Sequence, residues 1–222
     1  MLIGGGLPTW SCHPRTAGAS EFDFYTGKIA GDYLDGTSNQ KIMRINVVES
    51  VVLVVDLQQR LLPVINGGDA VLAEAMWIVD VAQAIHVPVL ATEHCPRNIG
   101  LTDPVLRSRL PADCIVEKTH FSAVTEGTLL QAPGADRRQW IVVGTEAHVC
   151  VLQTVLDLLS AGRKVFIVDE AVGSRRPRDK ELALHRMQQN GAEIVSREMV
   201  AFEWLECAEN PAFRDVLRRF IR

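Results

Sequence analysis

Val51-Val52-Leu53-Val54-Val55 is an unbroken run of β-branched and apolar residues, and Asp56 follows it directly. A strand with one solvated face alternates apolar and polar residues, whereas a strand buried on both faces reads as a continuous apolar run. We therefore expect residues 51–55 to form a strand inside a parallel sheet whose two faces are covered by helices. The carboxylate of Asp56 then lies where this strand ends.

Further apolar stretches predict five more strands, at residues 88–91, 114–116, 139–143, 164–168 and 193–195. Helical spacing of apolar residues indicates helices at 69–86, 149–159, 178–189, 199–206 and 211–221. Strands that alternate with helices indicate βαβ units. The expected fold class is α/β: a three-layer α/β/α arrangement around a mainly parallel, roughly six-stranded, Rossmann-like sheet.

The length of the chain suits one such domain. It has 222 residues, of which 47% are hydrophobic and 23% are charged. Residues 1–42 differ from the rest, because they contain Gly4-Gly5-Gly6, Pro8 and Pro14 but no sustained period. We expect them to be an irregular N-terminal extension, and we expect the folded domain to comprise residues 43–222.

Charge and cysteine content bear on partners and compartment. The formal net charge of −4 provides neither the basic footprint of a nucleic-acid-binding protein nor a polybasic membrane patch, so neither partner is expected. No apolar run is long enough to cross a bilayer, and the first residues do not read as a secretory signal. The cysteines are scattered and form no C-x-x-C pair, which suits a reducing compartment, here the cytoplasm. They are Cys12, Cys95, Cys114, Cys150 and Cys207.

Three reactive side chains stand at the ends of the expected strands. In open parallel sheets, ligands bind outside the carboxyl ends of the strands. Asp56 follows the first strand, and Lys118 follows the strand at 114–116. The strand at 139–143 leads into a turn, and Cys150 comes at the start of the next helix. A carboxylate, an amine and a thiol are therefore expected at one edge of the sheet.

These three groups suit nucleophilic catalysis. A cysteine on the first turn of a helix lies near the positive end of the helix dipole, which favours the thiolate, and a neighbouring lysine lowers its pKa further. A carboxylate can accept the thiol proton and later activate water. Taken singly, Cys150 is typical of a core residue, Asp56 of a turn cap and Lys118 of a solvated loop. Their convergence favours a catalytic site, because reactive groups cluster at such sites.

The segments around these residues resemble the motifs of isochorismatase-like cysteine hydrolases, and most closely those of the isochorismatase domain-containing proteins. The similar stretches are Val54–Gln59, Glu117–Ala123, Gly144–Val151, and Val168–Ala171 with Ser174-Arg175 after it. The resemblance extends from about Val47 to the C-terminus, and the motifs occur in the order of the family. It implies a homo-oligomeric enzyme.

The resemblance also implies a mechanism. Asp56, Lys118 and Cys150 would be the catalytic trio, acting on a small amide or related acyl compound through a thioester on Cys150. A cis peptide bond would join Thr145 and Glu146, and the backbone N–H groups of Glu146 and Cys150 would bind the oxyanion.

Three further residues are expected to contact the small-molecule substrate, namely His94, Phe121 and Thr145. His94 also raises the question of a metal, because nicotinamidases of the same superfamily bind zinc with an Asp-x-His pattern and a further histidine. Here the segment reads Thr92-Glu93-His94-Cys95-Pro96, with no second histidine nearby. We therefore expect no metal and no other cofactor.

Other functions remain open at this point. The family contains many members without an assigned substrate, so a non-catalytic, hydrolase-like scaffold that acts through protein contacts is one alternative. Some true isochorismatases lack the cysteine and cleave a vinyl ether by acid catalysis from the aspartate, here Asp56. A flavodoxin-like domain that binds a nucleotide or transfers electrons shares the architecture, but no fingerprint in the sequence indicates one.

Overall fold

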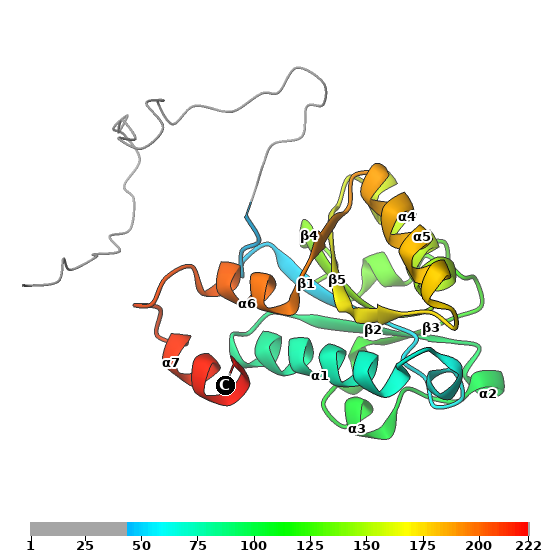
Figure 1. The fold of residues 1–222 in the computed structure, drawn as a ribbon. Helices are drawn as coiled ribbons and strands as arrows, with labels where there is room; N and C mark the ends of the chain where they lie inside the picture. Colours follow the sequence, from blue (N-terminus) through cyan, green and yellow to red (C-terminus); the bar gives the residue numbers. More distant parts are fainter. Residues whose placement is uncertain (1–43, 222) are drawn as a thin grey trace, which may run out of the picture. The chain divides into compact units, whose positions relative to one another are not determined.

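A six-stranded sheet forms the centre of the structure, a computed structural model that describes residues 44–221 (Figure 1). All neighbouring strands are parallel, so the prediction of an α/β fold is confirmed and the sheet is parallel throughout. The expected extension, residues 1–42, lies outside the described residues. In spatial order the strands are β3 (Ile115–Lys118), β2 (Val89–His94), β1 (Ser50–Val55), β4 (Gln139–Thr145), β5 (Lys164–Gly173) and β6 (Glu193–Val195).

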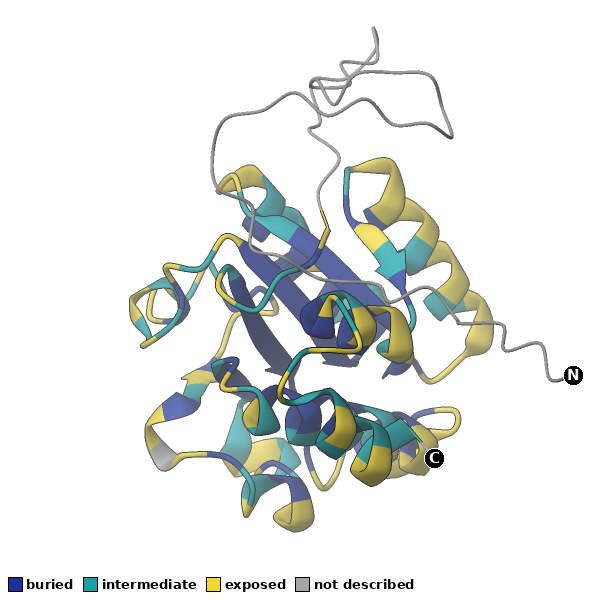
Figure 2. Cartoon of the chain, turned by 90° about the vertical axis from the view of Figure 1, so that its left-hand side faces the viewer, coloured by how far each residue is buried: buried dark blue, intermediate teal, exposed yellow. Residues whose placement is uncertain are grey.

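Strand β1 lies inside the sheet, and all six of its residues are buried, as its apolar run predicts. Figure 2 shows the strands of the central sheet mostly in the colour of buried residues. From β1 the chain builds the sheet outward through β2 and β3, and it then returns to the other side of β1 with β4. The register pairs Val55 with Thr92 of β2 and with Gly144 of β4. The carboxyl ends of these strands are therefore level at the point where the strand order reverses, which is where open α/β sheets bind ligands.

Gly144 allows β4 to approach β1 closely at this point. Its φ is +125°, and a Cβ atom built there would lie 2.0 Å from the carbonyl oxygen of Val55. Any other residue would push the two strands apart, because such a separation is far below van der Waals contact. The pairing of β4 with β5 also shifts in register between Val142 and Gly144. The turn that follows β4 thus starts from an irregular strand end.

Helices cover both faces of the sheet (Figure 1). One layer contains α1 (Gly68–Ala84) and α6 (Arg197–Leu205), and the other contains α4 (Leu152–Ser160) and α5 (Pro177–Gln189). These two layers and the sheet are the expected three layers. None of the described helices is both long enough and apolar enough to cross a membrane.

The helices differ from expectation in detail. The segment expected as a helix at 149–159 starts earlier, with a π-helical turn (Ala147–Val151) that contains Cys150 and leads into α4. The expected helix at 211–221 is a short α7 (Phe213–Val216) followed by a π-helical turn (Leu217–Ile221). Two short helices were not expected, α2 (Pro96–Ile99) and α3 (Pro104–Arg107). Their signal is the proline at the first helical position of each.

A buried hydrogen bond joins helix α6 to the first residue of β1. Trp204 of α6 is 2% exposed, and its Nε1 donates to Ser50 Oγ at 2.9 Å. Helix α6 itself begins at a serine cap, where Ser196 Oγ accepts from the Met199 N–H at 3.2 Å. The bond from Trp204 satisfies the indole N–H that its burial would otherwise leave unpaired.

Candidate active site

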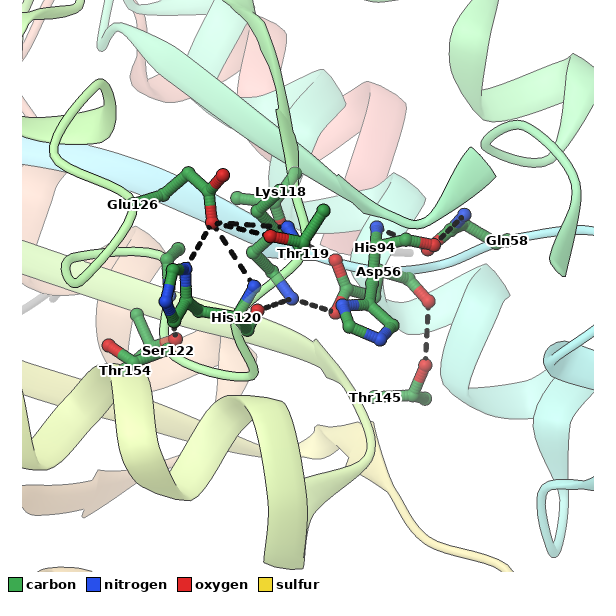
Figure 3. Close-up of polar contacts among 12 residues, drawn as sticks. Asp56, Gln58, His94, Lys118, Thr119, His120, Ser122, Glu126, Thr145 and Thr154 are labelled. Atoms are coloured by element: carbon green, nitrogen blue, oxygen red, sulfur yellow. Dashed lines mark hydrogen bonds and ion pairs between the residues drawn. The ribbon is translucent and has the colours of Figure 1, made fainter. Parts of the chain in front are cut away.

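Asp56 and Lys118 form a fully buried ion pair at the carboxyl ends of β1 and β3 (Figure 3). Lys118 Nζ lies 2.7 Å from Asp56 Oδ2, and both side chains are 0% exposed. Removing two charges from water is costly, and only close pairing with further hydrogen bonds compensates for that cost. A buried pair of this kind at a strand edge is therefore more typical of a functional site than of a stabilising contact.

The second oxygen of the Asp56 carboxylate is also occupied. Thr92 Oγ1, at the level of Asp56 in the neighbouring β2, donates to Asp56 Oδ1 at 2.6 Å. The backbone of Asp56 has a φ of +48°, which is uncommon for a residue with a side chain, and its carbonyl oxygen accepts from Thr145 Oγ1 at 2.8 Å. These contacts hold the carboxylate in one orientation between β1 and its neighbours.

Lys118 is held from its other side by the loop that follows β3. Its Nζ donates to the carbonyl oxygen of His120 at 3.3 Å. The carboxylate of Glu126 fastens this loop, accepting from the N–H groups of Thr119 and His120 at 3.1 Å each and contacting His120 Nδ1 at 2.7 Å. The hydrogen bond to the His120 side chain and those to the backbone lower the pKa of Glu126 to about 2. Glu126 therefore keeps these hydrogen bonds to the loop throughout the neutral pH range.

Cys150 completes the expected trio on the π-helical turn before α4. Its thiol is buried, at 6% exposed, and it interacts with both Asp56 and Lys118. Burial, and then the negative charge of Asp56, raise the pKa of Cys150 to about 12, although Lys118 acts in the opposite direction. Lys118 thus favours the thiolate, as expected, but burial and Asp56 outweigh its effect on the pKa of Cys150. The resting group is a neutral thiol beside a carboxylate that can accept its proton.

Asp56→Asn is expected to move the pH profile of Cys150 alkylation toward lower pH by about 1–3 units, because a nearby charge shifts a pKa by that amount. The sign follows from the charge: the Asp56 carboxylate disfavours the thiolate and raises the pKa of the thiol, so its removal lowers that pKa. The measurement is the rate of iodoacetamide labelling of the Cys150 peptide from pH 6 to 11. Asp136→Asn, on the surface, is the control and should leave the profile in place. A profile that does not move, or that moves to higher pH, would show that the Asp56 charge does not raise the pKa of Cys150.

Two of the three expected substrate contacts lie beside the trio. The rings of His94 and Phe121 are in contact, with centroids 5.4 Å apart and planes inclined by 33°. Phe121 is 49% exposed, although it is a large apolar residue. Partial burial, and then the charge of Lys118, lower the pKa of His94. The ring of Phe121 is therefore partly open to solvent, and the contact of both rings with substrate stays a prediction.

Thr145, the third expected contact, is fully buried, and its hydroxyl donates a hydrogen bond to the Asp56 carbonyl oxygen. That bond assigns Thr145 a supporting role in the site, while its contact with substrate stays a prediction. The Thr145–Glu146 peptide bond is cis, as the resemblance implies. The side chain of Glu146 turns to Arg175, whose Nε lies 2.9 Å from Glu146 Oε2. Only the backbone of Glu146 is thus left for the oxyanion role, which also stays a prediction.

Possible ligand positions around the site are described by its metal-binding potential and by one open cavity. Across residues 44–221, no group of three or more histidine, cysteine, aspartate or glutamate side chains is placed to hold a metal ion. A cavity of about 430 Å³ opens beside Lys118, between the turn after β2 and the end of β3. Its lining includes Lys118 but not Asp56 or Cys150. The lining residues are Cys95, Pro96, Arg97, Asn98, Glu117, Lys118, Thr119 and Glu126.

The supporting residues were not identified from the sequence. Thr92, Gln58 and Glu126 all hold a member of the site, and the first two are buried polar residues in contact with neighbouring strands. Gln58 follows Asp56 by two positions, and Thr92 lies at the end of the second expected strand. Their closeness to expected strand ends could therefore have identified both residues as part of the site. For Glu126 we find no comparable signal, because its role depends on how the loop folds back.

Comparison with known proteins agrees with this geometry. A family model described as the isochorismatase domain matches residues 50–199. Isochorismatase family protein 1A of Dictyostelium discoideum is 31% identical over 173 residues, or 76% of this chain and 84% of that protein. Isochorismatase domain-containing protein 2 of Danio rerio is 32% identical over 179 residues, or 79% of this chain and 88% of that protein.

Solved structures share the fold. A protein described as the MAR1 ribonuclease of Caenorhabditis elegans superposes with a TM-score of 0.73 at 33% identity, over 81% of this chain and 93% of that chain. An Escherichia coli protein described as an octameric hydrolase of unknown specificity superposes with a TM-score of 0.76 at 23% identity, over 82% and 93% of the two chains. The family model and the relatives above 30% identity together show that this chain belongs to the isochorismatase family.

Proposed function

We propose that the protein is a cysteine hydrolase that cleaves a small amide or related acyl compound through a thioester on Cys150. The observation that carries the proposal is the buried Asp56–Lys118 pair beside the buried thiol. A thiol whose pKa lies near 12 is a poor nucleophile at neutral pH unless a base accepts its proton during attack. Asp56 is the base, and Lys118 holds its carboxylate in place.

In the first half of the reaction, Asp56 takes the proton of Cys150, and the thiolate attacks the carbonyl carbon of the substrate. Negative charge thereby moves from the carboxylate to the sulfur and then to the substrate oxygen. Lys118 interacts with both Asp56 and Cys150, so it compensates the charge at either place. The backbone N–H groups of Glu146 and Cys150 bind the oxyanion, and one such donor typically contributes about 3 kcal/mol. The protonated Asp56 then gives its proton to the leaving amine, which departs as the thioester forms.

In the second half, Asp56 accepts a proton from water, and the resulting hydroxide attacks the thioester. Collapse of the tetrahedral intermediate breaks the carbon–sulfur bond and releases the carboxylic acid product. The Cys150 thiolate takes back the proton held by Asp56, which restores the starting state. The one carboxylate serves both halves because Thr92 and Lys118 hold its two oxygens in a constant orientation.

A covalent intermediate is the expected result of rapid acid quenching during turnover. A panel of small amides and related acyl compounds is offered to the protein, and the Cys150 peptide is examined by mass spectrometry for an added acyl mass. We expect the acyl group on Cys150, because among the described cysteines it is the one that interacts with Asp56 and Lys118. Hydrolysis without any acyl-Cys150 would point to the vinyl-ether type of chemistry led by Asp56. A protein that turns over nothing and whose thiol reacts like the other cysteines would support the scaffold alternative.

Nucleic acid and membranes remain outside the proposal. The C. elegans neighbour is described as a ribonuclease, so RNA belongs in the same panel as a test. The net charge of −4 disfavours the binding of a polyanion, and we expect no RNA cleavage.

We further propose a cytoplasmic homo-oligomer without a metal or another cofactor, in which residues 43–222 form the hydrolase domain and residues 1–42 an extension. The E. coli neighbour is described as octameric, which supports an oligomer. Light scattering coupled to size exclusion measures the copy number.

A further inference from the structure

The cavity of about 430 Å³ beside Lys118 lies between two segments that a backbone hydrogen bond joins. One wall is the turn at residues 95–98, which includes the start of α2, and the other is the end of β3 with the loop that follows it. The joining bond runs from the Cys95 N–H to the Lys118 carbonyl oxygen, at 2.9 Å. The volume of the cavity is in the range of small-molecule binding sites, so it can hold a small organic ligand.

Arg97 brings a positive charge to the α2 side of this cavity. It is exposed, and within residues 44–221 its side chain forms neither an ion pair nor a hydrogen bond. Lys118, the other cation of the lining, is instead paired with Asp56 inside the protein. A guanidinium stays charged at every physiological pH, and its planar donors match the two oxygens of a carboxylate. Arg97 is therefore able to bind an anionic ligand.

A second guanidinium is held against the same turn. Arg60 Nη1 donates to the carbonyl oxygen of Asn98 at 2.9 Å, and the Arg60 N–H donates to that of Ile99 at 3.1 Å. In the part of the chain that the structure describes, no carboxylate forms an ion pair with Arg60. Two guanidinium groups at one turn, neither of them neutralised by a described carboxylate, give this side of the cavity a positive potential.

The carboxylates of the lining lie on the opposite wall, in β3 and in the loop that follows it. The Glu126 carboxylate is already used by the N–H groups of Thr119 and His120 and by the His120 ring (Figure 3). Glu117 is exposed, and among residues 44–221 it forms no ion pair with Arg97. The cavity therefore carries its free positive charge on the α2 side and its negative charges on the β3 side. An anionic ligand has its favourable position on the α2 side.

We propose that the α2 side of this cavity binds a small organic carboxylate, whose two oxygens accept hydrogen bonds from the Arg97 guanidinium. The exposed Asn98, whose side-chain amide can donate, also lines the cavity beside it. This site is additional to the proposed function, because neither Cys150 nor Asp56 lines the cavity. The carboxylate belongs either to the remote end of the substrate or to a separate small acid, and labelling of the two thiols distinguishes these sources.

Cys95 is a natural reporter thiol, because it lines the cavity two positions before Arg97 and is only half-buried. Iodoacetate carries a carboxylate where iodoacetamide carries an uncharged amide, so the ratio of their labelling rates reports how the cavity interacts with a negative charge. Both rates are measured at the Cys95 peptide by mass spectrometry, in the folded full-length protein at low ionic strength. We expect Arg97→Gln to lower the ratio of iodoacetate to iodoacetamide labelling at least about threefold, because it removes the attractive charge.

Two further variants are the controls. Helix α5 leads from the carboxyl end of β5 back to the start of β6, so its last turn, which contains Arg186, lies at the opposite edge of the sheet. Arg186→Gln removes an exposed arginine there and should leave the ratio at Cys95 unchanged. Glu117→Gln removes a negative charge from the β3 side of the cavity and should raise the ratio. Circular dichroism and thermal unfolding check that all variants are folded.

Succinate, a small dicarboxylate, is the equilibrium probe. With ionic strength matched by sodium chloride, we expect succinate to slow iodoacetamide labelling of Cys95 in the wild type but not in Arg97→Gln. If succinate slows the labelling of Cys150 as well, the bound acid reaches the catalytic thiol, as the remote end of a substrate would. If it slows Cys95 alone, the site takes a separate small acid. Calorimetric titration with succinate measures the same binding without using any thiol.

Three results overturn the inference: a ratio at Cys95 that Arg97→Gln leaves unchanged, succinate that protects no better than sodium chloride, and equal protection of Arg97→Gln. If Cys95 reacts with neither reagent, the calorimetric titration decides. Heat of binding in the wild type and not in Arg97→Gln then supports the site, and any other outcome overturns it. The proposed hydrolysis fails separately, when no acyl compound forms a thioester on Cys150, since none of these measurements requires turnover.

Discussion

Cys150→Ala abolishes hydrolysis in the expected result, with kcat/KM lower by a factor of roughly 10⁴–10⁶, the scale on which removal of a catalytic nucleophile acts. The alanine removes the atom that forms the thioester, and no other cysteine of the described residues interacts with both Asp56 and Lys118 in the way that Cys150 does. The protein should stay folded, because only one buried sulfur atom is lost. Steady-state kinetics on the best acyl substrate and thermal unfolding of the same sample measure both effects.

The matched control is Cys207→Ala, which removes a half-buried thiol in the turn after α6. It should leave kcat/KM within about twofold, as expected for a substitution away from the site. Cys150→Ser adds a second comparison, because it keeps the size of the side chain but replaces the thiol by a hydroxyl that is much harder to ionise. Full activity in Cys150→Ala would exclude the thioester and leave Asp56 as the group that leads the chemistry.

Lys118→Met is expected to lower the free energy of unfolding by about 3–5 kcal/mol and to remove most of the activity. Methionine keeps the apolar stem of the lysine but leaves the fully buried Asp56 carboxylate without its cation. Breaking a buried ion pair by removing one partner is costly on this scale, because the remaining charge stays buried and unpaired. Urea unfolding at pH 7, followed by circular dichroism, measures the loss of stability.

A double variant distinguishes charge from packing. Asp56→Asn combined with Lys118→Met removes both charges, and it should recover most of the lost stability while remaining inactive, because buried pairs contribute little net stability. Arg178→Met is the matched control: it breaks the exposed pair with Glu181, whose N–O distance is 2.9 Å, and should change stability little. A double variant as unstable as Lys118→Met would show that the loss comes from packing around Lys118 and not from the unpaired charge.

Much of the fold was predictable because its signals are local. The apolar run at residues 51–55 identified a strand buried on both faces, and the alternation of strands with helices identified a parallel sheet. Helix ends and short helices were less predictable, as α2, α3 and the π-helical turn before α4 show. Such elements depend on where prolines, caps and neighbouring strands place the chain.

The sequence by itself determined which reactive groups meet, since Asp56 and Cys150 come after strands, Lys118 ends one, and parallel strands end at one edge of a sheet. Only the tertiary structure decided the protonation of the thiol. The Cys150 thiol is neutral at rest because its burial and the Asp56 charge outweigh Lys118, and burial is a property of the packed molecule. The support from Thr92 and the fastening by Glu126 likewise depend on contacts between segments that only the folded chain brings together.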